Sequence, residues 1–253
     1  KLGPEVEGKS PNKHNKFFIT VEPLEKQYVQ AMKEGKLPET RIKKKDKSVV
    51  ETLVNLGMDT KQAKKVRELY KGNMLIDDTR GIVYIGEVIE MIMDAVEQVI
   101  DAGPLSREPC SNLLIRIKDL KLHEDAIHRG PAQVYPAVRE AIKSSMDGAS
   151  AFILEPVQII QIESPAEFLG DLSALVQNKR GQLLNVDQEG DHITAKAKMP
   201  VAEMFGLASD IRSATSGRGS QFLVDQMFEK LPESLRSKVI QQIRSRKGLS
   251  ENA

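Results

Sequence analysis

The sequence contains 253 residues, and its 37 Lys and Arg against 36 Asp and Glu leave a formal net charge of +1 at neutral pH. Overall charge therefore cannot attract polyanions, which only locally basic surface could do. No run of about 18 apolar residues is present for a membrane span, and a single cysteine, Cys110, excludes an internal disulfide and fits a cytosolic protein. The chain begins at Lys1 without methionine or a signal-peptide pattern, so we expect a two-domain part of a longer protein.

The N-terminal part of the chain predicts a loop, a strand and two short helices. Residues 1–15 are polar with glycine and proline, and the β-branched and aromatic run Phe17–Val21 predicts a strand. A helix is expected from Pro23 to about Glu34, with proline at its start. The basic run Arg41–Lys47 predicts a charged connector, which is usually a solvated face. After it, Ser48-Val-Val-Glu51 has the spacing of a capping box at the start of the second helix.

The next segment predicts two further helices with a short strand between them. Residues 59–72 predict a helix, because apolar residues such as Val66 and Leu69 recur at helical spacing before a glycine stop. Met74–Ile76 predicts a short strand. The longest helix is expected over residues 84–102, where an apolar stripe continues for several turns.

A strand, a loop and a helix then follow one another closely. The alternating run Leu114–Lys118 predicts a strand, and Gly130-Pro131 marks the start of a helix. Between them lies Leu122–Gly130, a loop with two histidines and two carboxylates. Loops held by rigid elements often carry function. This unit completes a first domain that we place at residues 1–150.

Residues 151–231 predict a second domain. The expected elements are, in order, a strand at Val157–Ile162, a helix that starts at the capping box Ser164–Glu167 and ends at Gly181, strands at Gln182–Val186 and His192–Met199, a helix at about 202–213 and a strand at Phe222–Phe228. This β-α-β-β-α-β order predicts a ferredoxin-like sandwich, so the fold class is α+β with two domains. A last helix over residues 232–248 carries an apolar stripe, and we expect it to return to the first domain because the sandwich is already closed.

The chemistry of the loop at residues 122–130 allows three interpretations. A metal site is weakly supported, since the spacing of His123 and His128 on a loop does not enforce ligand geometry. General acid–base chemistry by His128 with Asp125 is possible, but no nucleophile or oxyanion loop accompanies it. The third interpretation is a structural histidine that orients the loop. The sequence also contains no G-x-x-x-x-G-K-[ST] phosphate loop, and this chain therefore has no GTPase site of that type. We predict no catalytic residue, metal or cofactor in this chain.

Five short motifs identify a protein family more specifically than the chemistry of their side chains does. They are Ser10-Pro-Asn-Lys-His-Asn15, Asp125-Ala-Ile-His-Arg-Gly130, Leu154-Glu-Pro-Val157, Lys179-Arg-Gly181 and Pro200-Val-Ala-Glu-Met-Phe-Gly206. In this order and spacing, from about residue 5 to 230, they resemble the translation elongation factor 2 family, the archaeal and eukaryotic ribosomal translocases. Pro131-Ala132, where eukaryotic members carry glycines, makes the sequence resemble archaeal members.

The resemblance implies a fold and a function. Residues 1–150 with the helix 232–248 would form the fourth domain of the family, with a fold like the second domain of ribosomal protein S5. Residues 151–231 would form the fifth, ferredoxin-like domain. In the family the fourth domain is a rigid arm whose tip enters the decoding region during GTP-dependent translocation of tRNA and mRNA. The matching tip residues are Pro11, Asn12, Lys13, His14, Asn15, His123, Asp125, His128, Arg129 and Gly130.

The resemblance also implies partners. The ribosome, its rRNA and the tRNA–mRNA duplex would contact the tip, whereas GTP and Mg²⁺ would bind a domain outside this chain. His128 matches the histidine that the family converts to diphthamide, so the diphthamide biosynthesis enzymes would act on it, and ADP-ribosylating toxins would act on the modified residue. A cytoplasmic location and no membrane partner are implied. We expect the side chains of Lys13, His14, His128 and Arg129 to be exposed, so that replacing them changes stability by about 0.5 kcal/mol or less.

Three alternatives stay open. A small catalytic domain that uses His128 would need a pocket with a perturbed titratable pair around that residue. A stand-alone RNA-binding module of the ferredoxin-like type would carry a basic and aromatic face on the sheet of the second domain. A related GTPase of ribosome biogenesis or splicing is the third alternative, which Asp125–Gly130 fits less well than the translocase.

Overall fold

The computed structural model describes residues 1–43 and 46–249, and contacts divide the chain into two compact units. The first unit comprises Lys1–Ala151 together with the chain from Lys238, and the second comprises Phe152–Ser237. Lys44 and Lys45 of the expected charged connector lie outside the described residues. Within the described part of the chain, no helix has the length and apolar character that a membrane crossing requires.

A five-stranded sheet forms the centre of the first unit. Its strands are β1 (Val6–Lys9), β2 (Lys16–Pro23), β3 (Val66–Tyr70), β4 (Asn73–Asp77) and β5 (Leu113–Lys121). They are arranged in the order β1-β2-β5-β4-β3, and β4 and β5 are parallel whereas the other neighbours are antiparallel. The expected strands at residues 17–21, 74–76 and 114–118 are therefore confirmed.

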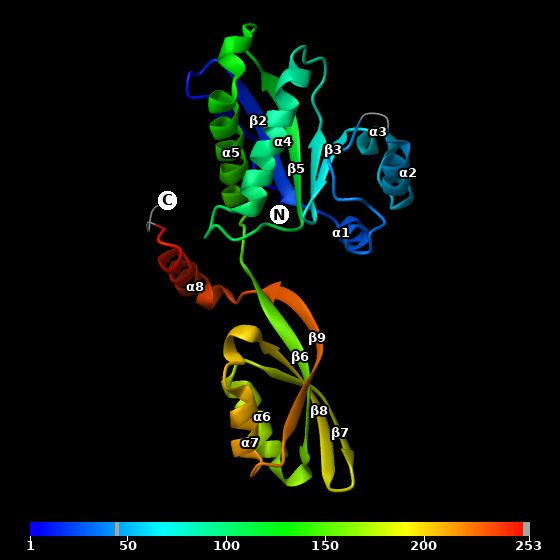
Figure 1. Ribbon diagram of the computed structural model, residues 1–253, viewed down its shortest axis with the longest axis vertical. Helices are drawn as coiled ribbons and strands as arrows, with labels where there is room; N and C mark the ends of the chain where they lie inside the picture. The colour runs from blue at the N-terminus through cyan, green and yellow to red at the C-terminus, as the bar shows by residue number, and fades with distance from the viewer. Residues whose placement is uncertain (44–45, 250–253) are drawn as a thin grey trace. The chain divides into compact units, whose positions relative to one another are not determined.

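Two long helices, α4 (Ile85–Asp101) and α5 (Pro131–Gly148), lie side by side over one face of this sheet (Figure 1). Their apolar stripes pack on inward side chains of the strands, including the fully buried Phe17. Burial of one such large apolar side chain contributes about 1.5–3 kcal/mol. The backbone of β1 approaches α5 so closely that a Cβ atom at Gly8 would lie 2.2 Å from the carbonyl oxygen of Ala137. Glycine is therefore required at this position.

Three short helices cover part of the opposite face. They are α1 (Lys26–Lys33), α2 (Lys47–Asn55) and α3 (Thr60–Ala63), and they enclose a second apolar core with β3 and β4. The predicted capping box at Ser48–Glu51 is wrong. The helix begins two residues earlier, at Lys47, and its N-cap is Asp46, whose carboxylate accepts a hydrogen bond from the N–H of Val49 at 3.4 Å. Pro23 likewise ends β2 rather than opening α1.

The helix predicted over residues 59–72 is also wrong beyond its first turn. The chain leaves α3 and forms β3, where Val66 and Leu69 are buried by pairing with β4 and not by a helical stripe. Lys71 and Gly72 have φ values of 46° and 73° and form the two-residue turn between the strands. Two consecutive positive φ values are typical of tight hairpin turns, and this hairpin overrides the helical spacing.

The second unit has the predicted β-α-β-β-α-β order and is a ferredoxin-like sandwich. Its elements are β6 (Leu154–Pro165), α6 (Leu169–Asn178), β7 (Gln182–Glu189), β8 (His192–Pro200), α7 (Leu207–Ala214) and β9 (Ser220–Lys230). The strands are antiparallel in the order β7-β8-β6-β9. The predicted capping box at Ser164–Glu167 is wrong, because β6 continues to Pro165 and the Ser164 hydroxyl donates to the Pro165 carbonyl at 2.9 Å.

The last helix, α8 (Glu233–Arg246), has no fully buried side chain among its described residues. Its end contacts the first unit through cations. Arg244 donates to the carbonyl of Leu105 at 3.1 Å, and Lys247 donates to the carbonyl of Arg107 at 2.7 Å and pairs with Glu108 at 2.6 Å. These contacts place basic groups at the negative end of the helix dipole.

Candidate functional site

The loop between β1 and β2 is ordered by its own polar groups. Its ends are joined by a hydrogen bond from the N–H of Ser10 to the carbonyl of Asn15 at 3.0 Å. Lys13 has a left-handed backbone with a φ of 62°, and its N–H donates to the carbonyl of Ser10 at 2.7 Å. The Ser10 hydroxyl donates to the side-chain oxygen of Asn12 at 2.6 Å. The loop therefore has one defined shape that presents the Lys13 and His14 side chains to solvent.

A single buried amide joins this loop to the loop after β5. The side chain of Asn15 is fully buried, and its Nδ2 donates to the carbonyl of His128 at 2.7 Å. Its Oδ1 accepts a hydrogen bond from the N–H of His123 at 3.0 Å. Asn12 adds a second, longer bond to the His128 carbonyl at 3.3 Å. Loops more than a hundred residues apart in sequence thus form one structure, which we call the paired tip (residues 10–15 and 122–130).

Three histidine rings gather on the paired tip. The ring centroids of His123 and His128 are 4.5 Å apart, and the ring of His14 lies 4.9 Å from each of them. His14 is exposed, whereas His123 and His128 are half-buried, so the prediction of a freely exposed His128 holds only in part. Asp125 caps the short 3₁₀ helix Ala126–Arg129 by accepting from the N–H of Ile127 at 3.1 Å.

The prediction that Arg129 is an exposed cation of the tip is wrong. Its side chain is only 4% exposed, and its guanidinium donates to the carbonyls of His123 and Glu124 and pairs with Glu87 at 2.5 Å. It also lies over the ring of Tyr84, 4.2 Å from the centroid. Carbonyls that converge at the end of a strand need donors, and the rigid fork of arginine supplies several of them at once. Arg129 therefore fastens the loop to the start of α4.

Sequence reasoning missed other residues that support the tip. Glu87 and Tyr84 hold Arg129, and the side-chain oxygen of Gln133 on α5 accepts from the N–H of Asn12 at 2.9 Å. None of them belongs to a recognisable motif. The only available signal was that Glu87 is an acidic residue in the first turn of α4. Pro11 is exposed beside Asn12, and Gly130 has an ordinary extended backbone as the residue before α5.

The polar groups of the tip are used to hold backbone. Asn15, Asp125 and Arg129 all bond to main-chain groups, and Nδ1 of His123 accepts from the N–H of Asp125 at 3.1 Å. In the part of the chain that the structure describes, no group of three or more His, Cys, Asp or Glu side chains is arranged to hold a metal ion. The arrangement is that of a preorganised surface for presenting His14, His128 and Lys13.

A cluster of charged residues lies elsewhere in the first unit, between β3 and α4. Arg41 pairs with Glu90 at 2.8 Å, with Asp94 at 2.5 Å and with Glu97 at 2.7 Å. The neighbouring Glu68 is buried, and burial together with Glu97 raises the pKa of Glu68 to about 8. Arg41 bridges three carboxylates of α4 to the edge of the sheet, so this cluster fastens the helix there.

In the second unit, the Lys179–Gly181 and Pro200–Gly206 segments contact each other. Lys179 donates to the carbonyls of Glu203 and Phe205 at 3.2 and 3.4 Å, and it pairs with Asp210 at 2.8 Å. The ring of Phe205 is 95% exposed. Lys179 therefore holds the turn before α7, and the phenylalanine beside it projects into solvent.

Family comparisons match both units. Residues 35–150 match the family model "Elongation factor G, domain IV", and residues 152–239 match "Elongation factor G C-terminus". These domains have the S5-like and ferredoxin-like folds that were expected from the sequence.

Curated relatives match along nearly the whole chain. Elongation factor 2 of Nanoarchaeum equitans is 48% identical over 99% of the chain, that of Pyrococcus furiosus is 46% identical over 100%, and that of Methanocaldococcus jannaschii is 47% identical over 97%. In each case the match covers 34% of the relative, so the chain spans about a third of their length. All three relatives are archaeal, which agrees with the expectation from Pro131-Ala132.

Proposed function

Because this chain belongs to the elongation factor 2 family, of which it carries domain IV and the C-terminal domain, we propose that it is part of a ribosomal translocase. In this proposal the paired tip enters the decoding region and holds the tRNA–mRNA duplex while both RNAs move by one codon. The observation that carries the proposal is the Asn15 amide, which joins the two loops into one rigid structure. A tip with one shape can occupy a site next to the duplex without first being ordered.

The contribution of this chain would be steric and electrostatic. Lys13 and His14 are exposed on the paired tip and can donate hydrogen bonds to RNA phosphates or to unstacked bases. In this proposal the partners are the ribosome, its rRNA and the tRNA–mRNA duplex in the cytoplasm. This chain would break and form no covalent bonds, and GTP with Mg²⁺ would bind a domain of the translocase other than the two matched here.

We also propose that His128 is the residue converted to diphthamide. Two bonds from Asn15 and Asn12 hold the backbone of His128, which leaves its half-buried imidazole at the surface of the paired tip. A modifying enzyme could therefore reach the ring without unfolding the loop. The added chain would extend the tip and carry a fixed positive charge, and ADP-ribosylating toxins would act on the modified residue.

The test uses a full-length factor that contains this chain. His128→Ala and Lys13→Ala are expected to leave GTP hydrolysis near normal and to slow translocation or to increase frame slippage. Lys36→Ala, an exposed lysine outside the tip, is the matched control and is expected to behave like the wild type. The mass of the peptide that contains His128 shows whether the residue is modified. A normal translocation rate together with normal reading-frame maintenance in both tip variants would refute the proposal.

A further inference from the structure

The face of the first sheet opposite α4 and α5 is covered only in part. The second apolar core under α1, α2 and α3 reaches β5 at Leu114 and does not include the end of β5 that lies next to the paired tip. Gln62 of α3 reaches β5 at Arg116, from which its side-chain oxygen accepts a hydrogen bond at 2.9 Å. Beyond Arg116, Phe18 is half-buried, and Lys118 and Lys121 are exposed.

Three lysines form a row across this open part of the sheet. Lys9 pairs with Lys16 in the register of β1 and β2, and Lys16 pairs with Lys121 in the register of β2 and β5. Residues paired in this way project from the same face, and alternation along β2 places Phe18 on that face, opposite the buried Phe17. The contact of Lys121 with the Phe18 ring, 5.8 Å from the centroid, agrees with this placement. We call this surface the lysine row (Lys9, Lys16, Lys121 and Phe18).

Carboxylates near the row neutralise only part of its charge. Glu7 lies between Lys9 and Lys16, 3.1 Å from each of their ammonium groups, and these contacts lower the pKa of Glu7. One carboxylate cannot neutralise two cations, and Lys121 adds a third. Asp119 lies opposite Phe18 in the register, and its carboxylate accepts from the N–H of Leu120 at 2.9 Å. The row keeps an excess of positive charge.

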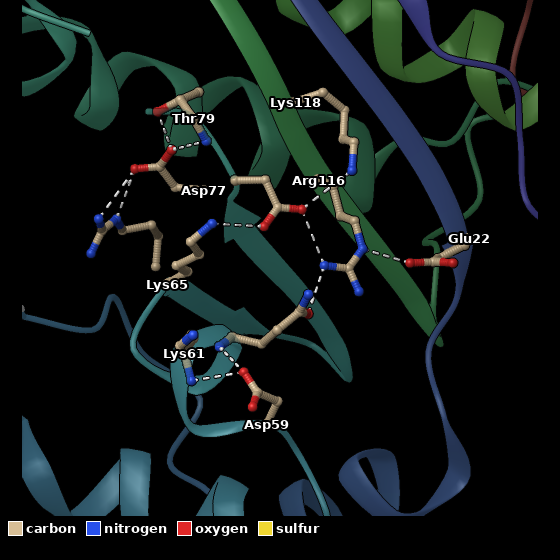
Figure 2. A network of polar contacts seen from close by, with 11 residues as sticks. Glu22, Asp59, Lys61, Lys65, Asp77, Thr79, Arg116 and Lys118 are labelled. Atoms are coloured by element: carbon tan, nitrogen blue, oxygen red, sulfur yellow. Dashed lines mark hydrogen bonds and ion pairs between the residues drawn. The ribbon is translucent and has the colours of Figure 1, made fainter. Parts of the chain in front are cut away.

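The adjoining network keeps a further lysine on the same side. Arg116 pairs with Glu22 at 2.6 Å (Figure 2), and Lys118 reaches the carboxylate of Asp78 at 3.4 Å. The Asp78 carboxylate is also approached by Arg116 at 3.3 Å and by Lys65 at 3.4 Å, so three cations share it, and the pKa of Asp78 is lowered, since these cations outweigh its burial. This network is a positive extension of the row.

The position of the row relates it to the paired tip. Lys9 and Lys16 directly flank the loop at residues 10–15, and Lys121 directly precedes the loop at residues 122–130. Adjacent strands lie about 4.8 Å apart, and lysine carries its charge on a flexible stem. Three ammonium groups at that spacing can therefore contact neighbouring phosphates of one strand. The exposed part of the Phe18 ring offers a platform on which an unpaired base can stack.

We propose that the lysine row binds the backbone of single-stranded RNA, with Phe18 stacking on one base. The inference deepens the proposed function and rests on it for the source of the RNA, which would be a strand that continues from the paired tip along the sheet. Its chemistry does not depend on His128. Binding can be measured with this chain alone, in the absence of ribosomes.

The probe is a fluorescently labelled uridine 12-mer, and its anisotropy is recorded against the chain at several salt concentrations. For single strands, each phosphate contact contributes about 0.7 to the slope of log affinity against log salt. Lys9→Gln/Lys16→Gln/Lys121→Gln should therefore lower the slope by about 2 and weaken binding about a hundredfold at 0.1 M salt. Phe18→Ala should weaken binding about tenfold at every salt concentration without changing the slope.

Two further variants make the test specific. Lys26→Gln/Lys33→Gln/Lys36→Gln removes the same charge from α1 and the residues after it, and Lys36 pairs with Glu34 at 2.6 Å much as the lysines of the row pair with Glu7. The three control lysines lie beyond Pro23, the end of β2 opposite Lys16. At 3.3 Å per residue, these two ends of the strand are about 23 Å apart, so the control variant should bind RNA nearly as the wild type does. Glu7→Gln should tighten binding, a gain that a folding defect cannot produce.

The outcomes separate this inference from the proposed function. Undetectable binding by the wild type, an unchanged slope in the lysine-row variant, or an equal loss in the control variant would overturn the inference. Weaker binding by Glu7→Gln would overturn it as well. If the differences in RNA binding hold while the full-length factor keeps its reading frame without His128 and Lys13, the proposed function fails and the RNA surface stands.

Discussion

Arg129→Ala tests whether the buried guanidinium holds the paired tip. The substitution removes the donors to the carbonyls of His123 and Glu124 and the ion pair with Glu87. Breaking a buried charged pair costs about 3–5 kcal/mol. The side chain of Glu87 is 53% exposed and can be hydrated again, so we expect the lower end, about 3 kcal/mol. This contrasts with the 0.5 kcal/mol expected from the sequence for an exposed residue.

Thermal unfolding of the chain measures this loss. For a domain of about 150 residues, each kcal/mol lowers the melting temperature by about 2–4 °C, so the first unit should melt about 6–12 °C lower. Arg129→Lys should give an intermediate loss, because lysine keeps the charge but lacks the fork. Lys13→Ala, an exposed residue of the same tip, should stay within about 0.5 kcal/mol of the wild type. A melting temperature for Arg129→Ala equal to that of Lys13→Ala would show that the buried contacts do not stabilise the loop.

Three other predictions concern the first unit. Burial and a neighbouring carboxylate raise the pKa of Glu68 from 4.5 to about 8, so between these values the unfolded chain loses a proton that the folded chain keeps. The free energy of unfolding should fall as the pH rises through this window, by at most about 1.4 kcal/mol per pH unit. In urea titrations at several pH values, Glu68→Gln should make this pH dependence flatter; an unchanged pH dependence would show that other groups cause it. Asn15→Ala should cost about 1–3 kcal/mol and speed amide exchange at His123, because it leaves the His123 N–H without its partner and the His128 carbonyl with only the longer bond from Asn12; protected exchange would contradict the bridging role. Gly8→Ala should destabilise by about 3 kcal/mol, since its Cβ would overlap a carbonyl of α5, and a melting temperature within error of the wild type would refute the close approach.

The sequence by itself determined the elements whose pattern is long and local. The stripe of α4 continues for several turns, and short apolar strand segments and helical stripes follow one another in the second unit, so the sequence pattern alone identified the helix and the β-α-β-β-α-β order. The same holds for the strand, loop and helix around residues 114–148, where Gly130-Pro131 marks the boundary. The motifs of the two loops identified the family, which the comparisons confirmed.

Tertiary structure decided what depends on partners distant in sequence. The three-residue spacing of Val66 and Leu69 fits a helix, and only the hairpin with β4, whose register shifts between Val66 and Glu68, makes this segment a strand. Asn15 was predicted only as part of a polar loop and of the tip, yet its burial and its bonds to His123 and His128 arise because β2 and β5 are neighbours in the sheet. Arg129 follows a histidine in an exposed loop, and nothing in that stretch shows that Glu87 and two carbonyls surround its guanidinium. A side chain's burial depends on which groups the fold brings to it. For Asn15, and for Arg129 with Glu87, those groups lie tens of residues away, and for Val66 and Leu69 they lie on the neighbouring strand.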